Sequence, residues 1–118
     1  MIIEDDLDIL DIITFILTES GYEVISSSNS SILSAAKNDY PDLILLDNRL
    51  PEGLGIEICQ RYKQQWVDAG ASVCPIIIIS ADHGVASLAE SYGADGFIEK
   101  PFEVAGFLAA VNKFAKNF

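Results

Sequence analysis

Apolar residues in this chain alternate between short continuous runs and helix-like stripes. Two runs stand out, Leu43-Ile44-Leu45-Leu46 and Ile76-Ile77-Ile78-Ile79. Each is too short for a helix, and each is bounded by a proline and by polar residues, which is typical of a strand buried on both faces. Shorter apolar segments predict three further strands, at residues 2–3, 22–25 and 96–99.

Between these runs, apolar residues recur every three to four positions, the spacing of one face of a helix. The pattern predicts helices at residues 7–18, 30–38, 56–67, 85–92 and 104–114. Each predicted strand is therefore followed by a helix. Such an alternation predicts an α/β fold of three layers, a doubly wound (βα)5 arrangement in which a parallel five-stranded sheet carries helices on both faces.

The length of 118 residues is about that of one domain, so we expect a single domain over residues 1–118. The longest apolar stretch, at 73–79, contains a proline and is far shorter than the ~20 residues of a membrane helix. Acidic residues stand at positions 4–6, where an export signal would carry basic residues. We therefore expect a cytoplasmic protein outside the membrane, with Cys59 and Cys74 reduced and buried. The first strand has only about three residues, which is short for a strand, so either the native chain begins upstream or this strand is unusually weak. The short start favours a piece of a longer protein.

The chain is strongly acidic, with 7 basic and 18 acidic side chains and a net charge of −11. Binding to nucleic acid requires a basic face. We therefore expect no direct contact between this chain and nucleic acid. Partners with a cationic patch, or a divalent cation at a cluster of carboxylates, are the ligands that this charge favours.

Reactive side chains follow four of the five predicted strands: Glu4 and Asp5, then Asp47, Ser80 and Lys100. The carboxyl ends of parallel strands meet at one edge of a sheet, where open α/β proteins bind ligands. Converging carboxylates repel each other unless a cation lies among them, and oxygen ligands of this kind suit Mg²⁺. A lysine and a hydroxyl can bind an anion at the same edge. This combination predicts an aspartyl phosphate formed on a nucleophilic carboxylate.

The stretches IIEDD, DLILLDNRLPEGLGIE, PIIIISA and GADGFIEKPF carry a family resemblance. On these residues, and over nearly its whole length, the chain resembles the receiver domain of two-component response regulators. The resemblance implies a flavodoxin-like sheet with strand order 2-1-3-4-5. It also implies a phosphoacceptor of a phosphorelay, which is not an enzyme beyond self-catalysed phosphorylation and dephosphorylation.

The resemblance assigns the acids at the sheet edge. Asp47 would accept the phosphoryl group from a histidine kinase or a histidine phosphotransfer protein. Glu4, Asp5 and Asp47 would hold Mg²⁺ together with the backbone carbonyl of Arg49. The chain carries each of these residues at the position where the family motif requires it.

The resemblance also assigns a switch. The hydroxyl of Ser80 would turn toward the phosphoryl group, and Lys100 would pair with it. Phe97 falls at the position of the family's switch aromatic, and the peptide bond between Lys100 and Pro101 is commonly cis. The switch would alter the face made by the fourth helix, the fifth strand and the fifth helix, which receivers use for partners and for homodimers.

Arg49 and Asp82 stand two residues beyond Asp47 and Ser80, respectively. In this family these positions tend to govern the access of hydrolytic water to the phosphoryl group. We hypothesise that the two side chains form a salt bridge over the site and slow hydrolysis.

Other interpretations of the same residues stay open. A hydrolase or phosphatase would need a second acid close after the nucleophile, where Asn48 and Arg49 stand. A flavodoxin-like cofactor binder would need a loop rich in Ser, Thr and Gly after the first strand, where acids stand. A receiver-fold interaction module that does not accept phosphate is the main alternative. Asp6 is best explained as an acid at a helix N-terminus, and Phe97 also as a core residue.

Overall fold

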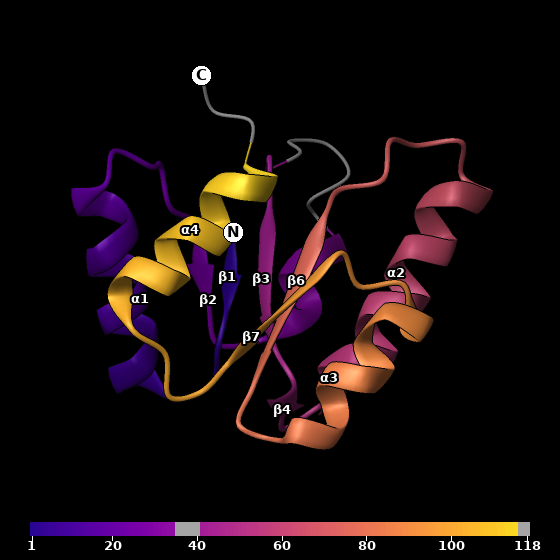
Figure 1. Cartoon of the computed structure of the whole chain (residues 1–118). Coiled ribbons are helices and arrows are strands. Elements are labelled where there is room, and N and C mark those ends of the chain that lie inside the picture. Colours follow the sequence, from indigo (N-terminus) through magenta and orange to yellow (C-terminus); the bar gives the residue numbers. More distant parts are fainter. Residues whose placement is uncertain (35–40, 116–118) are drawn as a thin grey trace.

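The computed structural model describes residues 1–34 and 41–115, and it has the predicted α/β architecture (Figure 1). A parallel sheet runs in the order β2-β1-β3-β6-β7. Its strands are β1 (Ile2–Ile3), β2 (Ser26–Ser27), β3 (Ile44–Asp47), β6 (Ile76–Ser80) and β7 (Gly96–Glu99). When these five are counted along the chain, the order is 2-1-3-4-5, so the predicted topology is confirmed.

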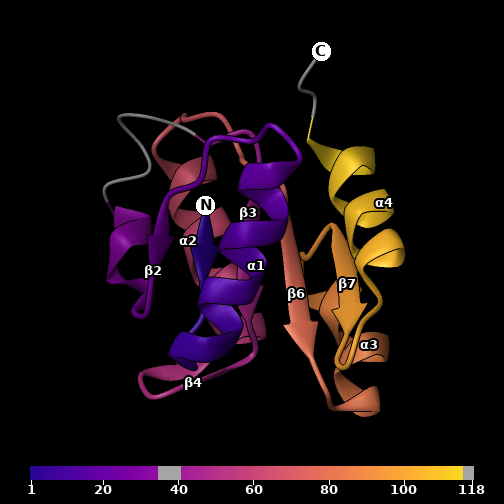
Figure 2. The ribbon, with the colours of Figure 1, turned by 90° about the vertical axis from the view of Figure 1, so that its left-hand side faces the viewer.

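Helices cover both faces of the sheet (Figures 1 and 2). They are α1 (Leu7–Glu19), α2 (Gly55–Asp68), α3 (His83–Ala89) and α4 (Val104–Phe114). One apolar cluster joins the sheet to α1 and α4, and a second joins it to α2 and α3. Strand β6 serves both, because Ile77 and Ile79 point to the first cluster while Ile76 and Ile78 point to the second. The central strands are therefore fully buried, as their apolar runs predict.

The edge strand β2 lies later in the chain than predicted. Residues 22–25 have the apolar pattern, but the residues that pair with Ile2 and Ile3 are Ser26 and Ser27. Tyr22 and Val24 instead pack against the cluster below α1 and α4. The prediction was wrong because an apolar pattern marks burial, whereas an edge strand is defined by backbone pairing.

The second predicted helix, at 30–38, begins at the expected residue but in a tighter form. Residues Ser30–Ser34 form a 3₁₀ helix whose Leu33 is fully buried under the sheet. The rest of that prediction lies outside the described residues.

The fourth predicted helix, at 85–92, begins two residues early. Asp82 caps α3 at its N-terminus, since its Oδ1 accepts a hydrogen bond of 2.9 Å from the backbone N–H of Gly84. The last predicted turn is a separate 3₁₀ turn, Glu90–Tyr92, which ends at Gly93 with a left-handed φ of +94°.

A small antiparallel hairpin between β3 and α2 is not anticipated by the apolar pattern. Strands β4 (Arg49–Leu50) and β5 (Gly53–Leu54) form it, with Arg49 opposite Leu54. Figure 1 shows β4 beyond the carboxyl end of β3. The hairpin therefore connects the end of the Asp47 strand directly to the start of α2.

Two further expectations concern the core and the membrane. Cys59 and Cys74 are free and buried, and burial raises the pKa of both thiols to about 11, so both remain protonated at neutral pH. In the part of the chain that the structure describes, no helix combines the length and the apolar character needed to cross a bilayer.

Candidate functional site

The predicted site residues meet at the carboxyl edge of the parallel sheet. Glu4 and Asp5 follow β1, Asp47 ends β3, Ser80 ends β6, and Lys100 follows β7. The fold brings these ends together because all of the strands are parallel and adjacent in the order given above.

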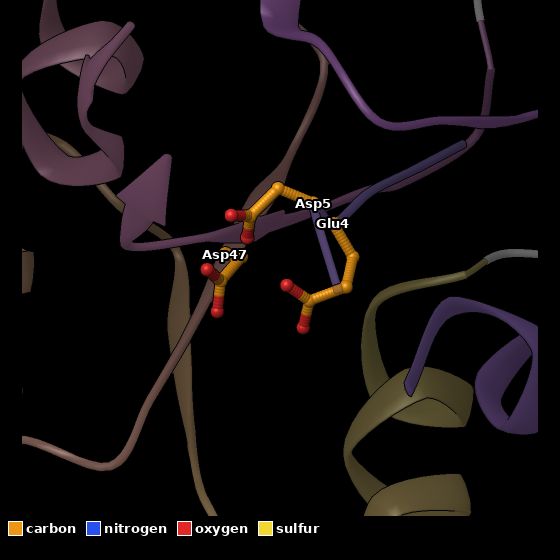
Figure 3. A group of neighbouring side chains, drawn as sticks. All are labelled: Glu4, Asp5 and Asp47. Carbon is orange, nitrogen blue, oxygen red and sulfur yellow. The ribbon is translucent and has the colours of Figure 1, made fainter. Parts of the chain in front are cut away.

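Three of these residues form a cluster of carboxylates (Figure 3). An oxygen from each of Glu4, Asp5 and Asp47 lies within 4.8 Å of the others. Figure 3 shows the carboxyl groups of Glu4 and Asp5 both directed toward Asp47. Glu4 is 2% exposed and Asp47 is 5% exposed, whereas Asp5 is open to solvent. The cluster therefore combines two buried acids with one accessible acid on its open side.

Lys100 supplies the positive charge inside this cluster. Its Nζ atom donates hydrogen bonds of 2.7 Å to Glu4 Oε1 and to Asp47 Oδ1. Burial by itself lowers the pKa of Lys100, but the hydrogen bonds and charges of Asp47 and Glu4 outweigh it. The pKa of Lys100 is therefore raised, and the ammonium is retained.

Glu4 is the acid most strongly affected by its surroundings. Burial is the main reason why its pKa is raised above the ordinary value, and the charge of Asp47 acts in the same direction. The hydrogen bonds from Lys100 and from the backbone N–H of Asp6 oppose this rise without cancelling it. Glu4 thus gains a proton more readily than a free glutamate unless further positive charge enters the site.

The donor set suits Mg²⁺. The available ligands are carboxylate oxygens, which hard divalent cations prefer, and two of the three acids are buried while the third is open to solvent. The carboxylate of Asp47 is already oriented, since its Oδ2 accepts a hydrogen bond of 3.2 Å from the backbone N–H of Arg49. The residues therefore fit the cation that the sequence predicts.

Ser80 is buried beside the acids and is tied to its neighbours. Its Oγ accepts a hydrogen bond of 3.0 Å from the backbone N–H of Asp82, and its carbonyl accepts one of 2.9 Å from the backbone N–H of Lys100. Phe97 is half-buried and packs on the cluster under α2 and α3. The peptide bond between Lys100 and Pro101 is cis, as the resemblance implies.

The hypothesised salt bridge is not formed in this structure. Among the ion pairs of residues 1–34 and 41–115, none joins Arg49 to Asp82. Both side chains are exposed, and Asp82 is engaged as the N-cap of α3. The access-tuning role of Arg49 and Asp82 stays a prediction.

Asn48 is a site residue to which the sequence analysis assigned no role. It follows Asp47 directly, is 3% exposed, and accepts a hydrogen bond from the backbone N–H of Ile56 at the start of α2. The sequence does show a polar residue immediately after a buried strand. It does not show that this residue bonds to a backbone N–H eight residues later.

Comparison with known proteins gives consistent results. The family model described as the response regulator receiver domain matches residues 1–112. Response regulator ArlR of Staphylococcus aureus is 36% identical over 122 residues, which cover 99% of this chain and 52% of ArlR. The alkaline phosphatase synthesis transcriptional regulatory protein PhoP of Bacillus subtilis is 33% identical over 105 residues, which cover 86% of this chain and 42% of PhoP. The chain thus spans about half the length of these curated relatives.

Solved structures share the whole fold. The receiver domain of NtrX from Brucella abortus superposes with a TM-score of 0.83 at 26% identity, covering 99% of this chain and 98% of that chain. The beryllofluoride-activated NtrC4 receiver domain dimer gives 0.83 at 25% identity, with coverage of 98% and 93%. The magnesium-bound receiver domain of sensor histidine kinase PA1611 from Pseudomonas aeruginosa superposes with a TM-score of 0.82 at 23% identity, covering 98% of this chain and 95% of that chain. At this identity the similarity supports the fold alone.

Sheet order, acidic edge and structural neighbours together define a flavodoxin-like signalling fold. The chain belongs to the family of response regulator receiver domains of two-component systems. Receiver domains are signalling domains and not classical enzymes. They generally bind Mg²⁺ in an acidic pocket and interact with histidine kinases and phosphotransfer proteins. The resemblance seen in the sequence is confirmed.

Proposed function

We propose that Asp47 accepts a phosphoryl group from the phosphohistidine of a histidine kinase or histidine phosphotransfer protein, in a Mg²⁺-dependent reaction, and that residues 1–118 act as one receiver domain. The carrying observation is the convergence of the carboxylates of Glu4, Asp5 and Asp47, together with the ammonium of Lys100 that donates hydrogen bonds to Glu4 and Asp47. A buried acid held among charges of both signs is the arrangement that phosphoryl transfer to a carboxylate needs.

Asp47 would act as the nucleophile. Lys100 holds its Oδ1 at 2.7 Å and the backbone N–H of Arg49 holds its Oδ2 at 3.2 Å, so the carboxylate has a fixed direction. In an in-line transfer, a carboxylate oxygen forms the new P–O bond while the P–N bond of the phosphohistidine breaks. The electron pair leaves with the imidazole of the donor, which takes up a proton.

Glu4, Asp5, Asp47 and the backbone carbonyl of Arg49 would hold Mg²⁺. When bound, the ion supplies positive charge for the phosphoryl oxygens and for the acids. Lys100 would exchange its carboxylate contact at Asp47 for a phosphoryl oxygen, which the flexible ammonium can do as a point charge. Lys100 thereby stabilises charge first on the free acid and then on the acyl phosphate.

Ser80 would start the switch. Its Oγ now accepts from the N–H of Asp82, and turning toward a phosphoryl group would break this bond and move residues 81–82. That displacement would bias the half-buried Phe97 and the face made by α3, β7 and α4, as a shift of an existing equilibrium. We further propose that this face contacts partner proteins and forms homodimers. We also propose that the protein is located in the cytoplasm.

Intact mass after incubation with acetyl phosphate tests the proposal. The wild-type chain should gain one phosphoryl group in the presence of Mg²⁺ but not in EDTA. Asp47→Asn should gain none, whereas Asp42→Asn, which alters an exposed acid before the same strand, should behave like wild type. No gain in the wild type, with Mg²⁺ binding shown by calorimetry, would refute the proposal and favour the phosphate-independent module.

A further inference from the structure

The start of α2 is capped by a residue outside the helix. Leu54 occupies the N-cap position with extended φ and ψ of −76° and 133°, yet its aliphatic side chain makes no capping hydrogen bond. Asn48 supplies the cap instead, since its Oδ1 accepts a hydrogen bond of 3.1 Å from the backbone N–H of Ile56. Ile56 is the second residue of the helix, and its N–H is a donor that an ordinary N-cap side chain would satisfy.

The backbone of Asn48 is fixed on both sides as well. Its N–H donates to the carbonyl of Ile79 in β6 at 2.9 Å, and its carbonyl accepts from the N–H of Gly55 in α2 at 2.7 Å. The approach of the helix is so close that a Cβ on Gly55 would lie 2.4 Å from the carbonyl oxygen of Asp47. Asn48 therefore joins the end of the Asp47 strand, the neighbouring strand and the helix at one buried point.

This point lies at the base of the hairpin that follows Asp47. Arg49 pairs with Leu54 across the hairpin, and the backbone N–H of Arg49 holds Asp47 Oδ2. If the start of α2 moved away from Asn48, the hairpin base would open and one of the two hydrogen bonds that orient Asp47 would weaken. A capping side chain at residue 54 would satisfy the helix but would not hold α2 against the end of β3, so it would not keep the hairpin base closed.

We propose that Asn48 is a positioning residue for the phosphoacceptor: its amide ties α2 to the end of β3 and thereby fixes the direction of the Asp47 carboxylate. The proposal rests on the proposed function of Asp47 for its effect on phosphorylation. Burying an amide beside the apolar core costs free energy that an apolar side chain at position 48 would avoid, which suits a specific orienting role.

The test separates the tie from simple helix capping. Asn48→Ala removes both the link between α2 and β3 and the helix cap. The double variant Asn48→Ala with Leu54→Ser gives α2 a local cap at the residue that already has N-cap geometry. Leu54→Ser alone is the matched control. Three quantities are measured for each variant: the urea midpoint of unfolding, the rate of phosphorylation by acetyl phosphate, and amide hydrogen exchange at Arg49 and Ile56 by NMR.

Asn48→Ala is expected to lower the urea midpoint, to slow phosphorylation about tenfold and to speed exchange at both amides. The double variant should regain the midpoint and the protection of Ile56, but it should remain slow in phosphorylation and unprotected at Arg49. Should Asn48→Ala not fold, the double variant compared with Leu54→Ser carries the same information.

Two outcomes would overturn the proposal. One is recovery of the phosphorylation rate and of Arg49 protection together with the midpoint, which would make Asn48 a helix cap only. The other is unchanged exchange at Arg49 in every variant. A wild-type chain that gains no phosphoryl group would instead refute the proposed function, and exchange at Arg49, which needs no donor, would still decide whether Asn48 orients Asp47.

Discussion

The ammonium of Lys100 lies 2.7 Å from the carboxylate of Glu4, although 96 positions of sequence separate the two residues. The same ammonium lies 2.7 Å from Asp47, so one lysine at the end of β7 serves acids at the ends of β1 and β3. This relationship links the stability of the protein to the charges that its proposed chemistry uses.

Replacing Lys100 by methionine should destabilise the protein in the absence of metal. Glu4 and Asp47 would be left buried without their counter-charge, and breaking such a pair costs about 3 kcal/mol. Mg²⁺ should restore part of this loss by entering the same cluster. Urea unfolding with and without MgCl₂ measures both effects. Lys113→Met, at an exposed position on α4, serves as the control, and an equal loss in both variants would contradict this account.

The raised pKa of Glu4 predicts how stability depends on pH. The folded protein holds the proton of Glu4 more tightly than the unfolded chain, whose reference value is 4.5. The resulting stabilisation is fully present below that value and is lost as the pH rises through the higher pKa of the folded state. In metal-free buffer, Glu4→Gln should therefore lose less stability than wild type over this interval.

Urea unfolding at a series of pH values checks the Glu4 prediction. Glu57→Gln, which alters an exposed glutamate on α2, should keep the wild-type profile. Superimposable profiles for wild type and Glu4→Gln would show that Glu4 does not titrate differently on folding.

Asp6 should matter for stability and not for chemistry. Its Oδ1 accepts hydrogen bonds from the backbone N–H groups of Asp8 and Ile9 at 3.0 and 3.3 Å, which confirms the interpretation of Asp6 as an acid at a helix N-terminus. Asp6→Ala should lower the free energy of unfolding by about 1 kcal/mol through loss of this cap. Phosphorylation by acetyl phosphate should continue at the wild-type rate, with Asp8→Ala as a control of equal charge change. A large loss of rate would place Asp6 in the site.

Arg49→Ala should shorten the lifetime of the aspartyl phosphate. The exposed guanidinium stands two residues beyond Asp47 and can approach an added phosphoryl group, where it would hinder attacking water. Decay is followed by mass after removal of the donor, with Arg61→Ala on the exposed face of α2 as control. An unchanged decay rate would end the access-tuning interpretation of Arg49.

The buried parts of the fold could be predicted from the sequence because their apolar pattern has a single structural explanation. The runs that became β3 and β6 are too short for helices and too apolar for an exposed sheet, and they are fully buried between two helical layers. Convergence of Glu4, Asp47 and Lys100 followed from parallel topology alone, without knowledge of any side-chain contact.

Features that depend on backbone pairing or on a single hydrogen bond could not be predicted. Strand β2 consists of two serines, which carry no apolar signal, and it exists because β1 offers backbone partners there. The early start of α3 depends on the side chain of Asp82, whose Oδ1 accepts a hydrogen bond from the backbone N–H of Gly84. The cap from Asn48 to Ile56 spans a hairpin and has no local pattern in the sequence.

Gly55 packs against the carbonyl oxygen of Asp47 without contributing any functional group of its own. A larger residue there would collide with backbone, which cannot rotate away as a side chain can, so the end of β3 would have to shift. In a genetic screen for lost signalling, alleles at position 55 would then resemble alleles of Asp47, the proposed phosphoacceptor. Isolates of this kind would keep every reactive residue intact, and their defect would be one of geometry.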